Sequence, residues 1–168
     1  MFDFGIENYR PQWLNGRPAV VAGHGQQLRA LIGRPLTHAW LVWDVRDDEW
    51  FSDCPVLLDF TGEQVEISHQ KFDDLSITWN TVDPHQSVQW PDFDLKWRHD
   101  VRPDLHALQD QILQDVELLE WTGSDMAQGT VAVSFRFPHS QLTIANALDE
   151  NQLTIGPPES GYRRHSLR

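Results

Sequence analysis

Two stretches of the chain, residues 28–79 and 105–156, carry apolar blocks in the same order at an offset of about 77 residues. A repeat at one offset constrains a fold strongly, because each copy has to form the same supersecondary unit. The matched blocks are Leu28–Leu31 with Leu105–Leu108, Leu36 with Leu113, Ala39–Val42 with Val116–Leu119, Val56, Leu58 and Phe60 with Val133, Phe135 and Phe137, and Val65 and Ile67 with Leu142 and Ile144. We predict a tandem structural duplication; chance coincidence of apolar residues is the alternative.

Each copy starts with a pattern typical of a short helix. Leu28 and Leu31 have one-turn spacing and Gly33 is a plausible stop, whereas Pro103 is a plausible start in the second copy. Apolar or alternating runs typical of strands follow, at residues 36–44, 55–60, 63–68 and 75–79 in the first copy, and 152–156 matches the last of these. Each copy is therefore predicted to be one helix followed by antiparallel strands.

The dipeptide Thr61-Gly62 separates two strand patterns and predicts a tight hairpin, since glycine tolerates the positive φ of such turns. A two-residue loop would place Leu58 opposite Val65 and Val56 opposite Ile67, with all four on the core face. The second copy predicts the same arrangement, with Phe135 near Leu142 and Val133 near Ile144.

These patterns predict an α+β fold with mostly antiparallel β structure, about eight strands and two short helices. The two copies are expected to form a curved sheet or a pseudo-twofold barrel within one domain, residues 1–168. Residues 1–23 are expected to be an arm, residues 80–104 a linker without a counterpart, and residues 157–168 a mobile tail. Alternation of Phe93, Leu95 and Trp97 predicts one short strand inside the linker.

Charge is unevenly distributed along the chain. The net charge is −12, and residues 36–156 alone carry −16. Such a field repels nucleic acids and anionic membranes and attracts basic proteins. We therefore expect a basic protein partner, no nucleic acid and no membrane; solubility is the alternative explanation of the charge.

The single cysteine, Cys54, precludes an intramolecular disulfide, and its apolar setting predicts a buried, unreactive thiol. No apolar run reaches the length of a membrane span, and the first residues lack the pattern of a signal peptide. These features predict a cytoplasmic protein.

Motifs for known chemistries are missing from the sequence. The eight histidines show neither helical nor strand pairing, no zinc signature is found, and Gly23-His24-Gly25, expected to be a flexible loop, is no phosphate cradle. We therefore predict no catalytic residue, no metal site and no cofactor. Asp73-Asp74 and Asp149-Glu150 hold equivalent places in the copies and are expected to form turns by accepting nearby backbone N–H groups.

The two copies differ most between residues 44 and 53. This segment holds five acidic residues around Trp50 and Phe51, whereas residues 121–130 hold one. Because fold requirements are alike in both copies, the extra charge indicates a partner-binding site. The residues predicted for it are Asp47, Asp48, Glu49, Trp50 and Asp53. The alternative is a solvated loop whose Trp50 and Phe51 pack into the core.

The stretch from Trp43-Asp44 through Trp50, then Pro55–Phe60 to Leu75–Asn80, resembles small acidic bacterial proteins of the toxin-immunity type. This resemblance implies an immunity protein that neutralises a basic toxin domain. A general binding or scaffold module, a small-ligand-binding barrel and an enzyme of unknown reaction are the alternatives, and the oligomeric state stays open.

Overall fold

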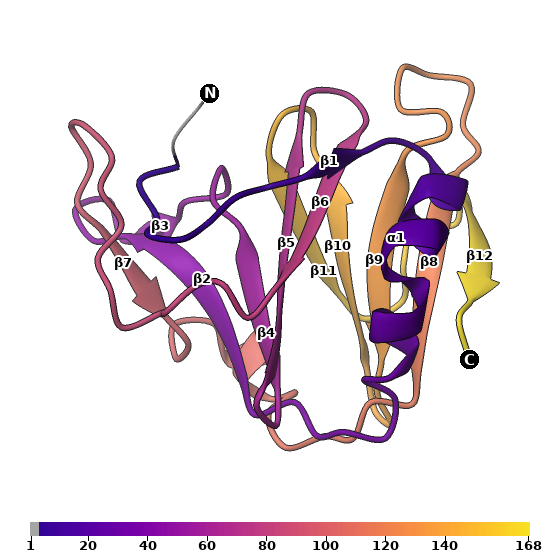
Figure 1. Ribbon diagram of the computed structural model, residues 1–168, viewed down its shortest axis with the longest axis horizontal. Coiled ribbons are helices and arrows are strands. Elements are labelled where there is room, and N and C mark those ends of the chain that lie inside the picture. The colour runs from indigo at the N-terminus through magenta and orange to yellow at the C-terminus, as the bar shows by residue number, and fades with distance from the viewer. Residues whose placement is uncertain (1–3) are drawn as a thin grey trace.

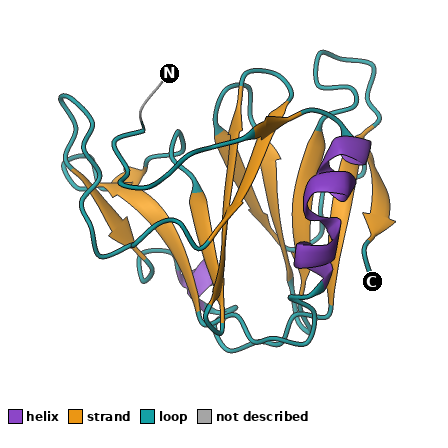
Figure 2. Ribbon diagram, viewed as in Figure 1, coloured by secondary structure: helices purple, strands orange, loops and turns teal. Residues whose placement is uncertain are grey.

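The structure is a computed structural model that describes residues 4–168, and it consists of two antiparallel sheets and two helices (Figures 1 and 2). The first sheet has the order β1-β6-β5-β4-β2-β3, with β7 also paired to β2, and the second has the order β11-β10-β9-β8-β12. The first-sheet strands are β1 (Trp13–Leu14), β2 (His38–Asp44), β3 (Glu49–Trp50), β4 (Val56–Phe60), β5 (Glu63–Gln70), β6 (Asp74–Trp79) and β7 (Leu95–Arg98). The second-sheet strands are β8 (Asp115–Trp121), β9 (Val131–Arg136), β10 (Gln141–Asn146), β11 (Asn151–Ile155) and β12 (Tyr162–Ser166).

The two sheets share one apolar core. Fully buried side chains from β4 and β5 form one cluster with those from β9 and β10, and the rings of Phe60 and Phe135 stack with centroids 5.7 Å apart. Helix α1 (Arg17–Arg29) lies against β8 and adds Val20 and Leu28 to this cluster (Figure 1). The burial of these side chains is the main force that joins the sheets.

Both predicted hairpin registers are confirmed. In the first sheet Val56 pairs with Ile67 and Leu58 with Val65, and Gly62 has a φ of 86°. In the second sheet Phe135 pairs with Leu142, and Val133 pairs with Ile144. All eight of these side chains are buried in the shared core.

The α+β class and the antiparallel pairing are confirmed, but the predicted strand count and the barrel are wrong. Residues 4–168 form twelve strands instead of about eight, and neither sheet closes. Strands β1 and β3 have two residues each, too short to leave a pattern in the sequence. The first sheet instead ends in the two-residue edge strands β1 and β3, which limit further pairing.

The predicted arm and tail both contain regular structure. Helix α1 begins at Arg17, inside the expected arm, and includes Gly23-His24-Gly25, so the flexible loop predicted there is wrong. Strand β12 lies inside the expected mobile tail and pairs with β8 over its whole length. The second helix, α2 (Pro103–His106), does begin at Pro103 as predicted.

The linker also has a counterpart, contrary to expectation. The predicted strand within it is β7, and β7 pairs with β2 as β12 pairs with β8. The five-strand orders β6-β5-β4-β2-β7 and β11-β10-β9-β8-β12 are therefore the same. This shared order is consistent with duplication; that the copies superpose stays a prediction.

A second core covers the outer face of the first sheet. It combines Val42, Leu57 and Trp97 from the sheet with Phe4, Ile6 and Tyr9 from the N-terminal segment, and with Val82 and Val88 from the stretch before β7. Both covering segments lack regular structure over most of their length. Of the helices between residues 4 and 168, none combines the length and apolar character required to span a membrane.

Besides the shared core, a buried amide side chain links the half of the molecule that contains the first sheet to the half that contains the second. The Asn151 side-chain oxygen accepts the His69 backbone N–H at 2.8 Å and lies 3.0 Å from His69 Nδ1. Its Nδ2 donates to the carbonyl oxygens of Ser52 and Cys54 at 3.1 and 3.0 Å. Asn151 on β11 thus satisfies backbone groups of the first half.

Candidate functional site

The predicted partner-binding segment begins with the tight β2–β3 hairpin. The Asp44 side chain is 4% exposed, and its Oδ1 accepts the backbone N–H groups of Arg46 and Asp47 at 3.1 and 3.3 Å. Asp48 has a φ of 52°, and its Oδ1 accepts a hydrogen bond from Trp43 Nε1 at 2.9 Å. These bonds fix the turn in one conformation, so its charges are held in place before any partner arrives.

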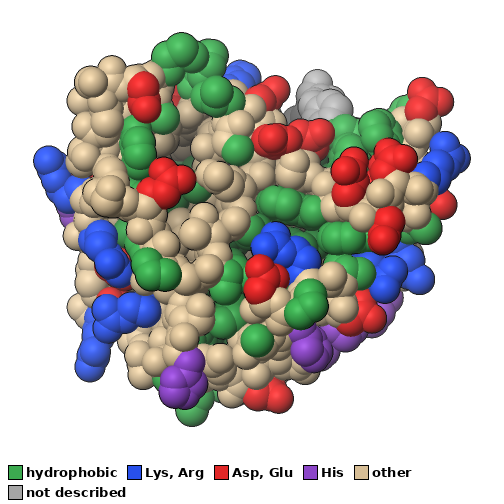
Figure 3. Space-filling model, turned by 180° about the vertical axis from the view of Figure 1, so that it is seen from behind, with side chains coloured by type: hydrophobic (Ala, Val, Ile, Leu, Met, Phe, Trp, Pro, Cys, Tyr) green, Lys and Arg blue, Asp and Glu red, His purple; other side chains and the backbone are tan. Residues whose placement is uncertain are grey.

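The hairpin concentrates negative charge. Asp47, Asp48 and Glu49 are all exposed, and carboxylate oxygens of Asp44, Asp47 and Glu49 lie within 4.8 Å of one another. In Figure 3, which views the molecule from behind, acidic side chains gather at the upper right of the face. Carboxylates this close produce a strong local potential that favours cations and basic side chains.

Trp50 does not project from the hairpin. It is half-buried and packs against the shared core, while Phe51 packs into the second core with its ring centroid 4.8 Å from that of Trp90. The alternative expectation, in which both aromatic side chains pack inward, therefore describes them correctly. Trp50 is consequently a poor candidate for an exposed anchor.

Two other apolar side chains are exposed beside the hairpin. Val45 is 45% exposed and Phe93 is 44% exposed. The Val45 N–H donates to the Asp94 carbonyl at 2.9 Å, which joins the two segments, and the Phe93 ring lies 4.8 Å from Phe51. We call the set Val45, Asp47, Asp48, Glu49, Phe93 and Asp94 the acidic hairpin surface. The sequence did not single out Val45 or Phe93, because their exposure depends on packing between distant segments.

Asp53 lies at the junction of the two halves. Burial raises its pKa, and the nearby carboxylates of Glu150 and Asp149 raise it further. Together with His69, Gln70, Phe4 and Trp90, Asp53 and Asp149 line a cavity of about 340 Å³. The structure thus places Asp53 against the β10–β11 turn.

The paired acids of the two copies also act at this junction. Asp149 Oδ1 accepts the Lys71 backbone N–H at 2.7 Å, and Glu150 Oε2 accepts the Ser52 hydroxyl at 2.7 Å. Asp74 instead accepts side-chain amides of Asn15 and Gln70. The expected bond to a backbone N–H is found for Asp149, although its donor belongs to the other half of the molecule.

Three histidines gather around Trp40, a cluster that the sequence analysis missed. The His99 ring centroid lies 4.6 Å from Trp40 and 5.0 Å from His38, and the rings of His38 and His85 lie 5.7 Å from Trp40. Trp40, His85 and His99 line a cavity of about 680 Å³, the Trp40 groove, together with Lys96, Arg98 and Asp100. One signal was available: His38 and Trp40 are two residues apart on a strand and therefore share a face.

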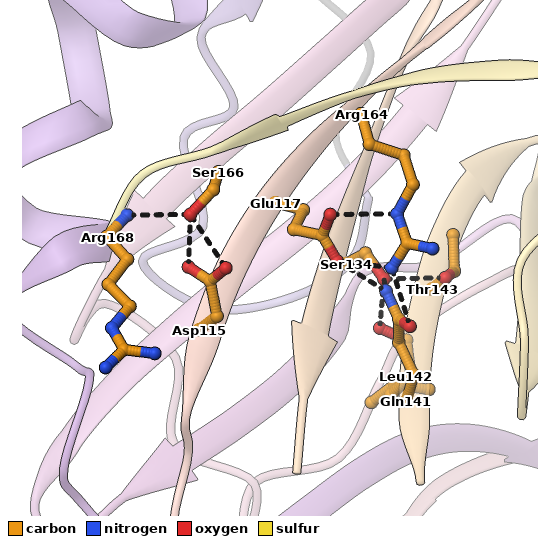
Figure 4. A network of polar contacts seen from close by, with 9 residues as sticks. All are labelled: Asp115, Glu117, Ser134, Gln141, Leu142, Thr143, Arg164, Ser166 and Arg168. Atoms are coloured by element: carbon orange, nitrogen blue, oxygen red, sulfur yellow. Dashed lines mark hydrogen bonds and ion pairs between the residues drawn. The ribbon is translucent and has the colours of Figure 1, made fainter.

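The outer face of the second sheet carries a polar network instead (Figure 4). Arg164 Nε and Nη2 donate to the two Glu117 oxygens at 2.9 and 2.6 Å, and Gln141 Nε2 donates to Glu117 at 3.0 Å and to Ser134 at 2.7 Å. The Arg164 guanidinium lowers the pKa of Glu117. Because the Glu117 carboxylate is fully engaged by these donors, we assign this network a structural role.

Cys54 is buried as expected. Burial raises its pKa well above the ordinary value of a thiol, and the charge of Asp53 raises it further. A thiol in this setting is a weak nucleophile.

Comparisons with known proteins give no match, so any assignment of function depends on the geometry of the candidate site. No protein-family model matches the chain, no curated protein matches it, and no solved structure matches it.

Proposed function

We propose that this protein is a cytoplasmic protein-binding domain that receives a basic protein partner on the acidic hairpin surface. The observation that carries the proposal is the combination of Asp47, Asp48 and Glu49 with exposed Val45 and Phe93 on neighbouring, hydrogen-bonded segments. An apolar centre with a charged rim is the common composition of protein–protein interfaces.

The two kinds of residue have separate tasks in this proposal. The carboxylates attract a basic partner over a distance and increase the association rate, while Phe93 loses contact with water in the complex and slows dissociation. The fixed hairpin lowers the conformational entropy lost on binding. A basic toxin domain, as neutralised by immunity proteins, is the partner class that we propose.

The first test is affinity capture from the native cell with the wild-type chain and with the triple variant Asp47→Asn, Asp48→Asn and Glu49→Gln. The partner enriched by the wild type should be basic and should be lost from the variant. Its association rate, measured by surface plasmon resonance, should fall as salt rises, because the Debye length shrinks from about 10 Å at 0.1 M to about 3 Å at 1 M. Phe93→Ala should increase the dissociation rate.

A matched control removes three exposed acids elsewhere, with Glu7→Gln, Asp110→Asn and Glu159→Gln. This control changes the net charge by the same amount and should retain the partner. If both triple variants behave alike, or if the captured partner is acidic or a nucleic acid, the charge serves solubility and the proposal is wrong.

A further inference from the structure

We propose that the His38–His99 pair beside Trp40 binds a divalent transition-metal ion through its two imidazoles. His38 lies on β2, next to Ala39 of the shared core, and His99 follows directly after β7. Because β7 pairs with β2, two residues far apart in the sequence are held on neighbouring strands. The site therefore rests on sheet structure and not on a mobile loop.

The separation of the two rings suits one metal ion. Their centroids lie 5.0 Å apart and their planes are nearly perpendicular, at 89°. With a metal–nitrogen distance of about 2.0–2.1 Å and tetrahedral angles, two imidazole centres on one zinc ion lie about 5 Å apart. The backbone thus already holds the rings at the spacing that shared coordination requires.

The ring nitrogens of this cluster lack protein partners. Within residues 4–168, neither ring nitrogen of His38, His85 or His99 makes a hydrogen bond to the protein, and His99 Nδ1 is buried. His24, His69 and His165 have polar neighbours at ring nitrogens, and among the remaining histidines of residues 4–168 only His99 has a ring nitrogen that is both buried and unbonded. A buried, unbonded nitrogen is energetically costly, and metal coordination would remove that cost.

The surroundings define the class of ion. Imidazole nitrogen is a preferred ligand of Zn²⁺, Ni²⁺ and Cu²⁺, whereas Mg²⁺ and Ca²⁺ prefer oxygen. Arg98 would repel a cation, but it is paired with Asp100 at 3.2 Å, so the local charge is partly neutralised. His106, which lines the same small cavity as His38 and His99, and His85, on an exposed turn beside Trp40, are further donors, and water would complete the coordination.

The proposal is independent of the protein-binding role and is tested with the full chain free of any oligohistidine tag. Isothermal titration with ZnCl₂ should show one equivalent bound. His38→Ala and His99→Ala should each weaken binding by about 10-fold or more, since even indirect perturbation of metal ligands costs 10–100-fold. His139→Ala, at an exposed position in a separate cavity of the second half, should leave the affinity unchanged.

A second measurement needs no variant and therefore does not depend on how each variant folds. Substoichiometric Ni²⁺ or Cu²⁺ should broaden the imidazole NMR signals of His38 and His99 before those of His139 or His165. Cu²⁺ should also quench part of the tryptophan fluorescence, and Trp40→Phe should reduce that part. Absence of Zn²⁺ binding, an affinity insensitive to both alanine substitutions, or broadening centred on other histidines would overturn the proposal.

Discussion

The outer faces of the two sheets have the same strand order beneath them but opposite chemistry at one central pair of residues. In the first sheet Trp40 on β2 pairs with Leu57 on β4, and in the second sheet Glu117 on β8 pairs with Ser134 on β9. These pairs hold matching positions at an offset of 77 residues. One backbone arrangement therefore supports an apolar pair at this position in one half and a polar pair in the other.

The difference determines what each face requires. An apolar face needs a cover, which residues 4–14 and 80–93 provide, whereas a buried carboxylate needs donors, which Arg164 and Gln141 provide. Both candidate binding sites, the acidic hairpin surface and the His38–His99 pair, lie beside aromatic side chains of the covered face. The half with the additional covering segments therefore also carries both candidate binding sites.

The largest loss of stability is expected when a fully buried apolar side chain on the outer face of the first sheet is shortened. Leu57 is fully buried, so Leu57→Ala should lower the free energy of unfolding by about 2–5 kcal/mol through lost burial and a cavity. At the matching position, Ser134→Ala should cost about 1 kcal/mol, since one hydrogen-bonding hydroxyl is lost. Urea denaturation of both variants measures this contrast, and equal losses would contradict it.

The junction between the halves should make stability depend on pH. Burial lowers the pKa of His69 to about 4 from an ordinary value of 6.5. The unfolded chain therefore binds a proton more readily, so stability should be complete above about pH 6.5 and fall towards pH 4, by about 3 kcal/mol in total. Urea midpoints measured across this range should show the decline, and it should be smaller in His69→Gln.

A smaller loss of stability is expected when the polar network around Glu117 is disrupted. Arg164→Met removes the charged partner of Glu117 and should cost about 1–2 kcal/mol at neutral pH, less than a fully buried pair because Arg164 is half-exposed. The pKa of Glu117 is lowered in the folded protein, so this contribution is present above about pH 4.5 and is lost as the pH falls further. The difference between wild type and variant should therefore shrink in acid; a constant difference would indicate lost packing alone.

Metal removal should have the smallest effect on folding. His38 and His99 belong to neither apolar core, so both cores stay intact when no metal is bound. Thermal melts in the presence and absence of EDTA should coincide when no metal has been added. A large drop in melting temperature on chelation would contradict this.

Sequence patterns predicted the parts of the fold that depend on local chemistry. The register of both central hairpins followed from strict alternation, because a slip of one residue would turn Leu58 and Val65 away from the core. Strand β12 escaped prediction because its sequence, Tyr162–Ser166, is polar and it pairs through its backbone. Helix α1 escaped because it contains two glycines and few buried apolar residues.

The residues of the candidate sites also differ in whether the sequence alone could predict them. The acidic hairpin was predicted because charged residues can be counted in the sequence. The exposure of Phe93 beside it was not predicted, because packing between distant segments decides which side chains are exposed. The histidine cluster was not predicted because its members come from β2, a turn and the end of β7, and only the sheet brings them together.

The buried amide of Asn151 bears on how independent the two halves are. A chain cut between them would leave the carbonyl oxygens of Ser52 and Cys54 and the N–H of His69 without their buried partner, and would open the inner faces of both sheets to water. We therefore expect that neither half would keep its present structure alone. If the chain arose by duplication, the copies have since become mutually dependent, and exchange of one half between homologous proteins would require its junction residues to move with it.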